Sequence, residues 1–190
     1  MNDDPRRAAA LAPSSSPETE TEVVVRSSEL DSFGHVNHAV FLSYLEHARF
    51  EALEAAGFSW SVLETRGWGV YVVRIEVDYL AEARRGDRLL VRTRAESFRR
   101  TSMVLVQEIV RRGRRGAGPA GSGAASGGEE RVVQARVTAV WIGPDKRPMR
   151  VPDEVRSGLS GDGPDGPAPH AAVLGPAGIG PDRPPPGTVP

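Results

Sequence analysis

The amino-acid sequence predicts an α+β fold in which an antiparallel sheet of about five strands wraps one long helix. Residues 37–56 carry apolar side chains every three or four positions, which is the period of an amphipathic helix. Most later segments instead alternate apolar and polar side chains with period two, as strands with one buried face do. Because one helix accompanies several successive strands, we expect the helix to lie against one face of the sheet.

The first part of this domain is predicted to be a strand, a turn and the helix, at residues 22–26, 31–35 and 37–56. Asn37 is a favourable residue for capping the start of the helix, and Gly57 is well placed to end it. The apolar stripe of the helix consists of Val40, Phe41, Tyr44, Leu45, Ala48, Ala52 and Leu53. Residues 58–67 are expected to form a short connection.

Four later segments are predicted to be half-buried strands. The side chains expected to share a face are Tyr71, Val73, Ile75, Val77 and Tyr79 in the first, Leu89, Val91, Thr93 and Ala95 in the second, Met103, Leu105 and Ile109 in the third, and Val133, Ala135, Val137, Ala139 and Trp141 in the fourth. The last three are expected in hairpin order, because residues 96–101 suit a tight turn. The Gly-rich residues 113–128 indicate a flexible insert between the last two strands.

The folding unit is expected to be shorter than the chain of 190 residues. Residues 1–19 are polar and rich in Pro and Ala, and residues 159–190 are dominated by Pro and Gly. Neither composition supports a packed core, so both segments are predicted to be disordered. The predicted domain therefore spans residues 20–158, including the insert.

Composition excludes several classes of function. The formal net charge of −1 gives no preference for nucleic acid, and no apolar stretch approaches the roughly 18 residues of a membrane span. Cysteine is absent, which excludes disulfides, thiolate metal sites and cysteine nucleophiles and favours the cytoplasm. No metal is expected at His35, His38 and His47, because zinc usually takes ligands from separate elements and no acidic partner shows matching spacing.

The segment around Asp31 suggests acyl chemistry. Asp31 lies on a Gly-containing turn just before the helix, whose first N–H groups are unpaired and carry a partial positive charge. A carboxylate beside such donors can attack a carbonyl, or activate water, while the N–H groups hold the oxyanion. The backbone amide of His38 is the expected donor, with Gly34 allowing close approach, and the His38 side chain is incidental. The residues alone leave open whether Asp31 is instead an ordinary turn residue.

The motif itself resembles a known family. The pattern Asp31-x-x-Gly-His-Val-Asn37, followed by Tyr44-Leu-Glu-x-Ala-Arg49, is similar to the hotdog-fold acyl-CoA thioesterases of the 4-hydroxybenzoyl-CoA thioesterase type. Residues 77–87 and 145–154 add matches in the same order along the chain. The resemblance implies a hotdog fold, thioester hydrolysis with Asp31 as the catalytic acid, and a homodimer or homotetramer whose active sites are shared between subunits. Coenzyme A is then part of the acyl-CoA substrate, and no cofactor is expected.

Four other residues of the motif belong to the candidate site. His35 either orients Asp31, contacts the thioester sulfur or stabilises the turn, and Asn37 is expected to be the helix cap. Tyr44 is expected to pack in the core or line the acyl pocket. Glu46 is three residues from Arg49, and a surface ion pair between them is preferred over an acid–base role for Glu46.

Arginines near strand ends are candidates for holding the phosphates of coenzyme A. The candidates are Arg84, Arg85, Arg99, Arg100, Arg147 and Arg150, each of which is alternatively a solvated surface charge. Two other functions are weighed against hydrolysis. A hotdog enoyl-CoA hydratase would need Asp and His five residues apart, whereas Asp31 and His35 are four apart. A non-catalytic acyl-CoA sensor or scaffold is the second alternative.

Overall fold

The computed structural model describes residues 17–112, 128–161 and 172–173. The elements follow in the order β1 (Thr19–Val24), η2 (Ser27–Glu29), α1 (His38–Ala55), α2 (Trp60–Arg66), β2 (Gly69–Tyr79), β3 (Arg88–Phe98), β4 (Ser102–Arg112), β5 (Glu129–Ile142), α3 (Asp153–Ser160) and β6 (Ala172–Val173). Most of the predicted disordered segments (1–19 and 159–190) and of the insert 113–128 lies outside the described residues. Within these segments, β1 already begins at Thr19, α3 ends at Ser160, and Ala172–Val173 forms the short strand β6.

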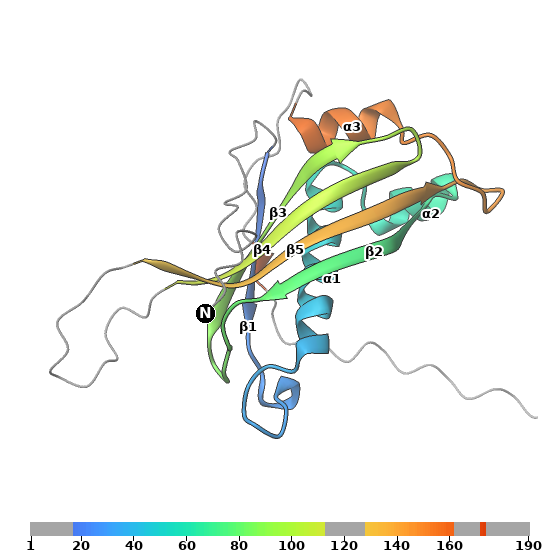
Figure 1. Ribbon diagram of the computed structural model, residues 1–190. Helices are drawn as coiled ribbons and strands as arrows, with labels where there is room; N and C mark the ends of the chain where they lie inside the picture. Colours follow the sequence, from blue (N-terminus) through green and yellow to red (C-terminus); the bar gives the residue numbers. More distant parts are fainter. Residues whose placement is uncertain (1–16, 113–127, 162–171, 174–190) are drawn as a thin grey trace, which may run out of the picture.

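The strands form one sheet in the order β2-β5-β4-β3-β1-β6 (Figure 1). Strands β1 to β5 pair antiparallel, as predicted, and only the two-residue β6 pairs parallel, with β1. The predicted hairpin order of β3, β4 and β5 is confirmed by their pairing registers. A register shift between Val72 and Arg74 interrupts β2, so the predicted single face from Tyr71 to Tyr79 is broken by a bulge.

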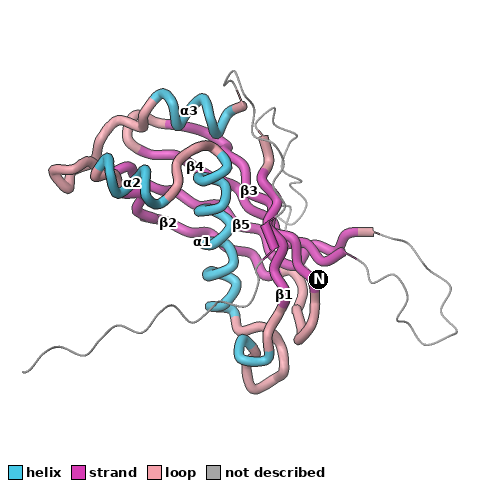
Figure 2. Tube along the Cα trace, turned by 180° about the vertical axis from the view of Figure 1, so that it is seen from behind, coloured by secondary structure: helices cyan, strands magenta, loops and turns pink. Residues whose placement is uncertain are grey.

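Helix α1 lies against one face of the sheet, which is clearest from behind (Figure 2). Asn37 caps it as predicted, because its side-chain oxygen accepts the backbone N–H of Ala39 at 2.9 Å. Gly57 follows the helix with φ +89°, a left-handed conformation that favours glycine. The buried side of α1 consists of Phe41, Tyr44, Leu45, Ala48, Arg49, Ala52 and Leu53. Apart from Arg49, all of these belong to the predicted stripe.

Two short α-helices and the 3-10 helix η2 were not predicted. The segment 58–67 is not a plain connection, because α2 forms there and ends at Gly67 with φ +63°. Helix α3 follows the loop after β5 and packs Val155 and Leu159 into the same cluster as Leu53, Leu63 and Trp141. None of the described helices is long and apolar enough to cross a membrane.

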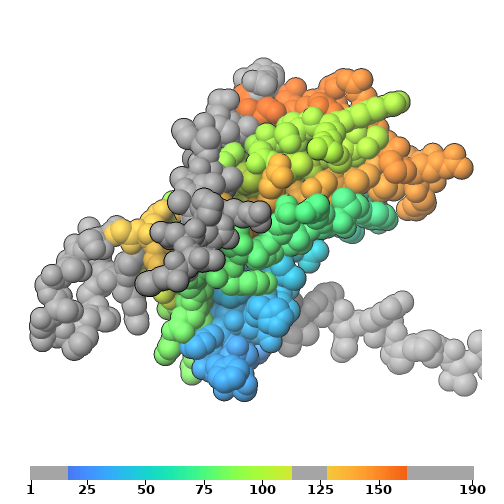
Figure 3. Space-filling view, viewed as in Figure 1, coloured from blue at the N-terminus to red at the C-terminus, as the bar shows by residue number. Residues whose placement is uncertain are grey.

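Strand β2 forms one edge of the sheet and is exposed along most of its length. It lies at the surface in the space-filling view, in green (Figure 3). Tyr71, Val72, Val73 and Tyr79 on this strand are 56%, 42%, 60% and 47% exposed. Of the face predicted for this strand, Ile75 and Val77 are partly buried against the core as expected, whereas Tyr71, Val73 and Tyr79 are exposed within the single chain. A long apolar edge of this kind is a surface that proteins usually cover.

Candidate active site

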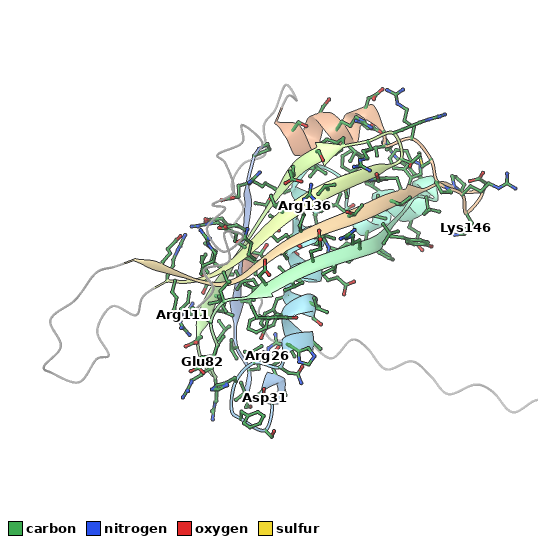
Figure 4. All side chains as sticks on the ribbon, in the orientation of Figure 1. Arg26, Asp31, Glu82, Arg111, Arg136 and Lys146 are labelled. Atoms are coloured by element: carbon green, nitrogen blue, oxygen red, sulfur yellow. The ribbon has the colours of Figure 1, made fainter. Side chains whose placement is uncertain are left out.

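Asp31 lies in a closed loop between η2 and α1, at the lower end of the molecule (Figure 4). Its backbone N–H donates to the His35 carbonyl at 2.8 Å, and its own carbonyl accepts from Gly34 at 3.1 Å. Gly34 has φ +78°, which a residue with a side chain rarely adopts. Carboxylate oxygen Oδ1 accepts the backbone N–H groups of Phe33 at 2.8 Å and His35 at 3.2 Å. Among the described residues nothing donates to Oδ2, so this half-buried carboxylate keeps one oxygen for chemistry.

The start of α1 offers a backbone donor. Asn37 directs its side chain to Ala39, and the Asn37 carbonyl accepts the N–H of Val40 at 2.9 Å. No hydrogen bond within the described part of the chain uses the N–H of His38, the first helical residue. The His38 side chain is exposed and stands edge-on to Tyr79, whose hydroxyl donates to the His38 carbonyl at 3.1 Å. The free His38 amide is the group that an oxyanion would need.

His35 is held by a loop that lies far away in the sequence. Its Nε2 atom is 2.9 Å from the Glu82 carboxylate, and Arg84 pairs with the same carboxylate at 2.7 Å. The backbone N–H of Val36 donates to Ala83 at 2.8 Å. These contacts fix the loop between β2 and β3 against the Asp31 loop. Glu82 was missed by sequence reasoning, because no local pattern connects it with a residue 47 positions earlier.

Tyr44 is buried, as predicted, but its hydroxyl forms a hydrogen bond with an acid other than Asp31. It donates to Oε2 of Glu29 at 2.6 Å. Burial and this hydrogen bond raise the pKa of Tyr44 above its ordinary value. Glu29 is therefore part of the site's framework, although no spacing in the sequence pointed to it.

The predicted surface ion pair between Glu46 and Arg49 is wrong. Glu46 is exposed, whereas Arg49 is 8% exposed and points into the core. The Arg49 guanidinium donates to Oε1 of Gln107 at 2.9 Å, and its burial lowers the pKa of Arg49. Gln107 in turn donates to the Leu45 carbonyl at 2.9 Å and to the Thr93 hydroxyl at 2.8 Å. This cluster stabilises the core and leaves Glu46 without a contact to the site.

The arginines proposed for phosphate binding divide into two groups. Arg84 is engaged with Glu82, and Arg150 lies 3.1 Å from Asp153. The others are exposed and form no ion pair with any described residue, namely Arg85, Arg99, Arg100 and Arg147. Of these, Arg85 lies in the same loop as Glu82 and is thus nearest in the chain to the residues that contact His35.

A cavity of about 350 Å³ opens beside the start of β2. Its walls are mainly aromatic and aliphatic, from Phe50, Trp60, Leu63, Trp68, Tyr71 and Ile142. Lys146, in the turn after β5, also lines it. Trp60 is 68% exposed at the mouth and stands edge-on to Phe50 at 5.9 Å. Glu64 lines it as well, so the cavity is mainly apolar with one charge of each sign, which fits a hydrophobic group.

Titratable groups do not assemble into a metal site in the part of the chain that is described. No group of three or more His, Asp or Glu side chains there is placed to hold an ion.

Comparison with known proteins shows that the chain is similar to thioesterases. A model of the thioesterase-like superfamily matches residues 25–159. The chain is 31% identical over 138 residues to acyl-acyl carrier protein thioesterase ATL2 of Arabidopsis thaliana, covering 73% of this chain and 66% of that relative. It thus spans just under two thirds of that relative's length. Over 82 residues it is 37% identical to acyl-CoA thioester hydrolase YbgC of Escherichia coli, covering 43% of this chain and 61% of the relative.

Among solved structures, 4-hydroxybenzoyl CoA thioesterase from Pseudomonas sp. strain CBS-3 matches with a TM-score of 0.63. Its sequence identity is 18%, and the match covers 74% of this chain and 98% of the other. At this identity the likeness concerns the fold, and it confirms the hotdog architecture expected from the sequence motif.

Proposed function

Because the chain belongs to the thioesterase-like superfamily, we propose that it hydrolyses acyl-CoA thioesters to a free acid and coenzyme A. One observation carries the proposal. A carboxylate with a free oxygen lies in the loop that leads directly into a helix whose first amide, that of His38, is unpaired among the described residues. A thioester carbonyl placed between them meets a nucleophile or base on one side and an oxyanion donor on the other.

The reaction can follow either of two balanced routes. In the first, Oδ2 of Asp31 attacks the acyl carbon, the C–S bond breaks, coenzyme A leaves as a thiolate, and water then hydrolyses the mixed anhydride. In the second, Asp31 takes a proton from water, the hydroxide attacks the acyl carbon, and the C–S bond breaks to leave the free acid and the thiolate of coenzyme A, which takes up the proton from Asp31. Both routes need the His38 amide where negative charge develops. In both routes, the contact between His35 and Glu82 helps to hold the loop that carries Asp31.

We propose that the active unit is a dimer joined through the exposed edge of β2. A strand that meets its own copy across a two-fold axis pairs antiparallel. The Tyr79 end of β2 lies beside the start of α1, as its hydrogen bond to His38 shows, and the Gly69 end lines the aromatic cavity. Antiparallel pairing therefore brings the Asp31 loop of one copy towards the cavity of the other. Two complete sites result, each with elements from both copies.

In that arrangement the aromatic cavity holds the acyl group. Its volume of about 350 Å³ lies at the lower end of the range for small-molecule sites. Trp60 and Trp68 form much of its wall, which suits an aromatic or medium-length apolar acyl chain. We assign the phosphates of coenzyme A to unpaired surface cations such as Arg85. Arg84, engaged with Glu82, is less suited to that role.

Thiol release tests the function. Purified protein is mixed with benzoyl-, phenylacetyl- and fatty acyl-CoA, and with a fatty acyl carrier protein as a second type of thioester. We expect wild type to release thiol, and Asp31→Asn to lower turnover at least about a hundredfold. Asp153→Asn, an exposed acid on α3, is the matched control and should leave turnover unchanged.

The alternatives are separated by this assay together with a parallel incubation with an enoyl-CoA, in which hydration of the double bond is followed. If wild type binds acyl-CoA but releases no thiol, the protein is a sensor or scaffold. If it hydrates enoyl-CoA instead, the hydratase alternative holds. If Asp31→Asn matches wild type, the site assignment is wrong. Accumulation of acylated Asp31 in rapid-quench mass spectrometry distinguishes nucleophilic attack from general-base catalysis.

A further inference from the structure

The residue Glu29 connects the Asp31 loop to helix α1 at several points. It ends η2, two residues before Asp31. Its Oε2 atom accepts the Tyr44 hydroxyl at 2.6 Å and the backbone N–H of Arg26 at 2.7 Å. Its backbone carbonyl accepts the N–H of Asn37, the helix cap, at 3.0 Å. One residue is thus bonded to the cap of α1 and to a side chain in its second turn. Figure 4 shows Arg26 and Asp31 together below the N-terminal end of α1.

These contacts differ from those that shape the loop itself. The bonds between Asp31 and His35, and the bridge between Leu30 and Val36, close the loop on itself. They preserve its shape, and through Val36, which adjoins the cap Asn37, they set its position against the helix only in part. The contacts of Glu29 with Asn37 and Tyr44 fix the loop against the helix, because both partners belong to α1 or its cap. The position of Asp31 relative to the His38 amide therefore depends on Glu29.

The partner of Glu29 is well suited to this task. Tyr44 is 5% exposed and packs edge-on against Phe41 at 6.1 Å, so its ring cannot shift without disturbing the core. A hydroxyl that donates to a carboxylate forms a short, strong hydrogen bond. A rigid buried donor and a charged acceptor together fix distance as well as direction. In other enzymes, a misplacement of reacting groups by about 1 Å can cost about a hundredfold in rate.

We propose that Glu29 is a positioning residue of the active site, which sets the Asp31 carboxylate against the start of α1 through its hydrogen bond with Tyr44. The inference rests on the proposed thioesterase function. It goes beyond the sequence motif, which begins at Asp31, and it gives Tyr44 a role in aligning the site.

Three variants test this role in the full chain. Tyr44→Phe removes the hydroxyl but keeps the buried ring, Glu29→Gln keeps a neutral acceptor of the same size, and Glu29→Ala removes the acceptor. We expect Tyr44→Phe and Glu29→Ala each to lower kcat about tenfold to a hundredfold, with KM within about twofold. Glu29→Gln should recover part of the loss. Because both residues act through one bond, Tyr44→Phe combined with Glu29→Ala should lower kcat no further than Glu29→Ala alone.

Controls separate positioning from loss of folding and from failure of the proposed function. Glu54→Gln, an exposed acid on α1, should keep wild-type kcat, and circular dichroism should show every variant folded at the assay temperature. If Asp31→Asn is inactive while the Glu29 and Tyr44 variants keep wild-type kcat, the positioning role is wrong. Losses that multiply in the double variant, or that affect KM alone, also overturn it. If Asp31→Asn is fully active, the assignment of Asp31 fails instead, and if wild type releases no thiol, the proposed function fails.

Discussion

Replacing Gln107 by leucine should destabilise the protein strongly, although the side chains have similar size. Gln107 is 1% exposed and accepts a hydrogen bond from the Arg49 guanidinium at 2.9 Å. Its amide nitrogen donates to the Thr93 hydroxyl at 2.8 Å and to the Leu45 carbonyl at 2.9 Å. Leucine offers no polar atom, so the substitution leaves a buried cation without this acceptor.

The magnitude follows from the bonds that are lost. A hydrogen bond to a charged group contributes about 1.5–3 kcal/mol, and a neutral one about 0.5–1.5 kcal/mol. The Leu45 carbonyl lies within α1 and can keep a helical partner, so its loss should be small. The Arg49 and Thr93 bonds together predict a loss of about 3 kcal/mol in the free energy of unfolding. Leaving a buried charged donor without its acceptor commonly has an effect of this size.

Equilibrium unfolding in urea at constant protein concentration measures the effect. Arg49→Met combined with Gln107→Leu removes both polar partners, and we expect this double variant to recover at least half of the loss. Gln134→Leu, a half-buried position on β5, is the control and should change stability by less than about 0.5 kcal/mol. A Gln107→Leu variant within about 1 kcal/mol of wild type, or a double variant as unstable as the single one, would refute the reasoning.

Three further outcomes are expected. Asn37→Ala removes the α1 cap and should lower the free energy of unfolding by about 1 kcal/mol in urea titrations. Trp60→Ala removes an aromatic wall of the cavity and should lower kcat/KM for benzoyl-CoA at least about tenfold more than for acetyl-CoA. The raised pKa of Tyr44 means that the unfolded chain loses this proton first, so stability should fall as the pH rises above about 10. Tyr44→Phe should lack that component of the fall.

Local periodicity predicted most of the architecture. The three- and four-residue spacing placed α1 correctly between its cap Asn37 and Gly57, and the period of two placed β3, β4 and β5. Helices α2 and α3 were missed because elements of seven and eight residues show too few turns for a clear period. The exposure of β2 could not be predicted either, since its apolar pattern is that of a strand which a neighbour covers.

The contacts that arrange the site were outside the reach of local patterns. Arg49 occupies a core position of the α1 stripe, but its charge suggested a surface residue. Only the neighbouring strand shows that Gln107 lies opposite it to accept its hydrogen bond. Glu29 and Glu82 contact residues that are 15 and 47 positions away, and no local pattern in the sequence predicts these contacts. The motif therefore predicted which residues could react, and the structure adds the residues that hold them.

The loop between β2 and β3 also holds residues of the candidate site. The loop contains no candidate nucleophile, yet Glu82 binds His35 and the Ala83 carbonyl accepts the N–H of Val36. Arg111 fastens the loop to the sheet through Asp87 at 2.7 Å and through the Glu82 carbonyl at 3.1 Å. The position of the Asp31 loop is thus determined from two sides, by Glu29 towards α1 and by this loop towards the sheet. If Asp31 reacts as proposed, we expect the loss of either attachment to let its carboxylate rotate relative to the His38 amide.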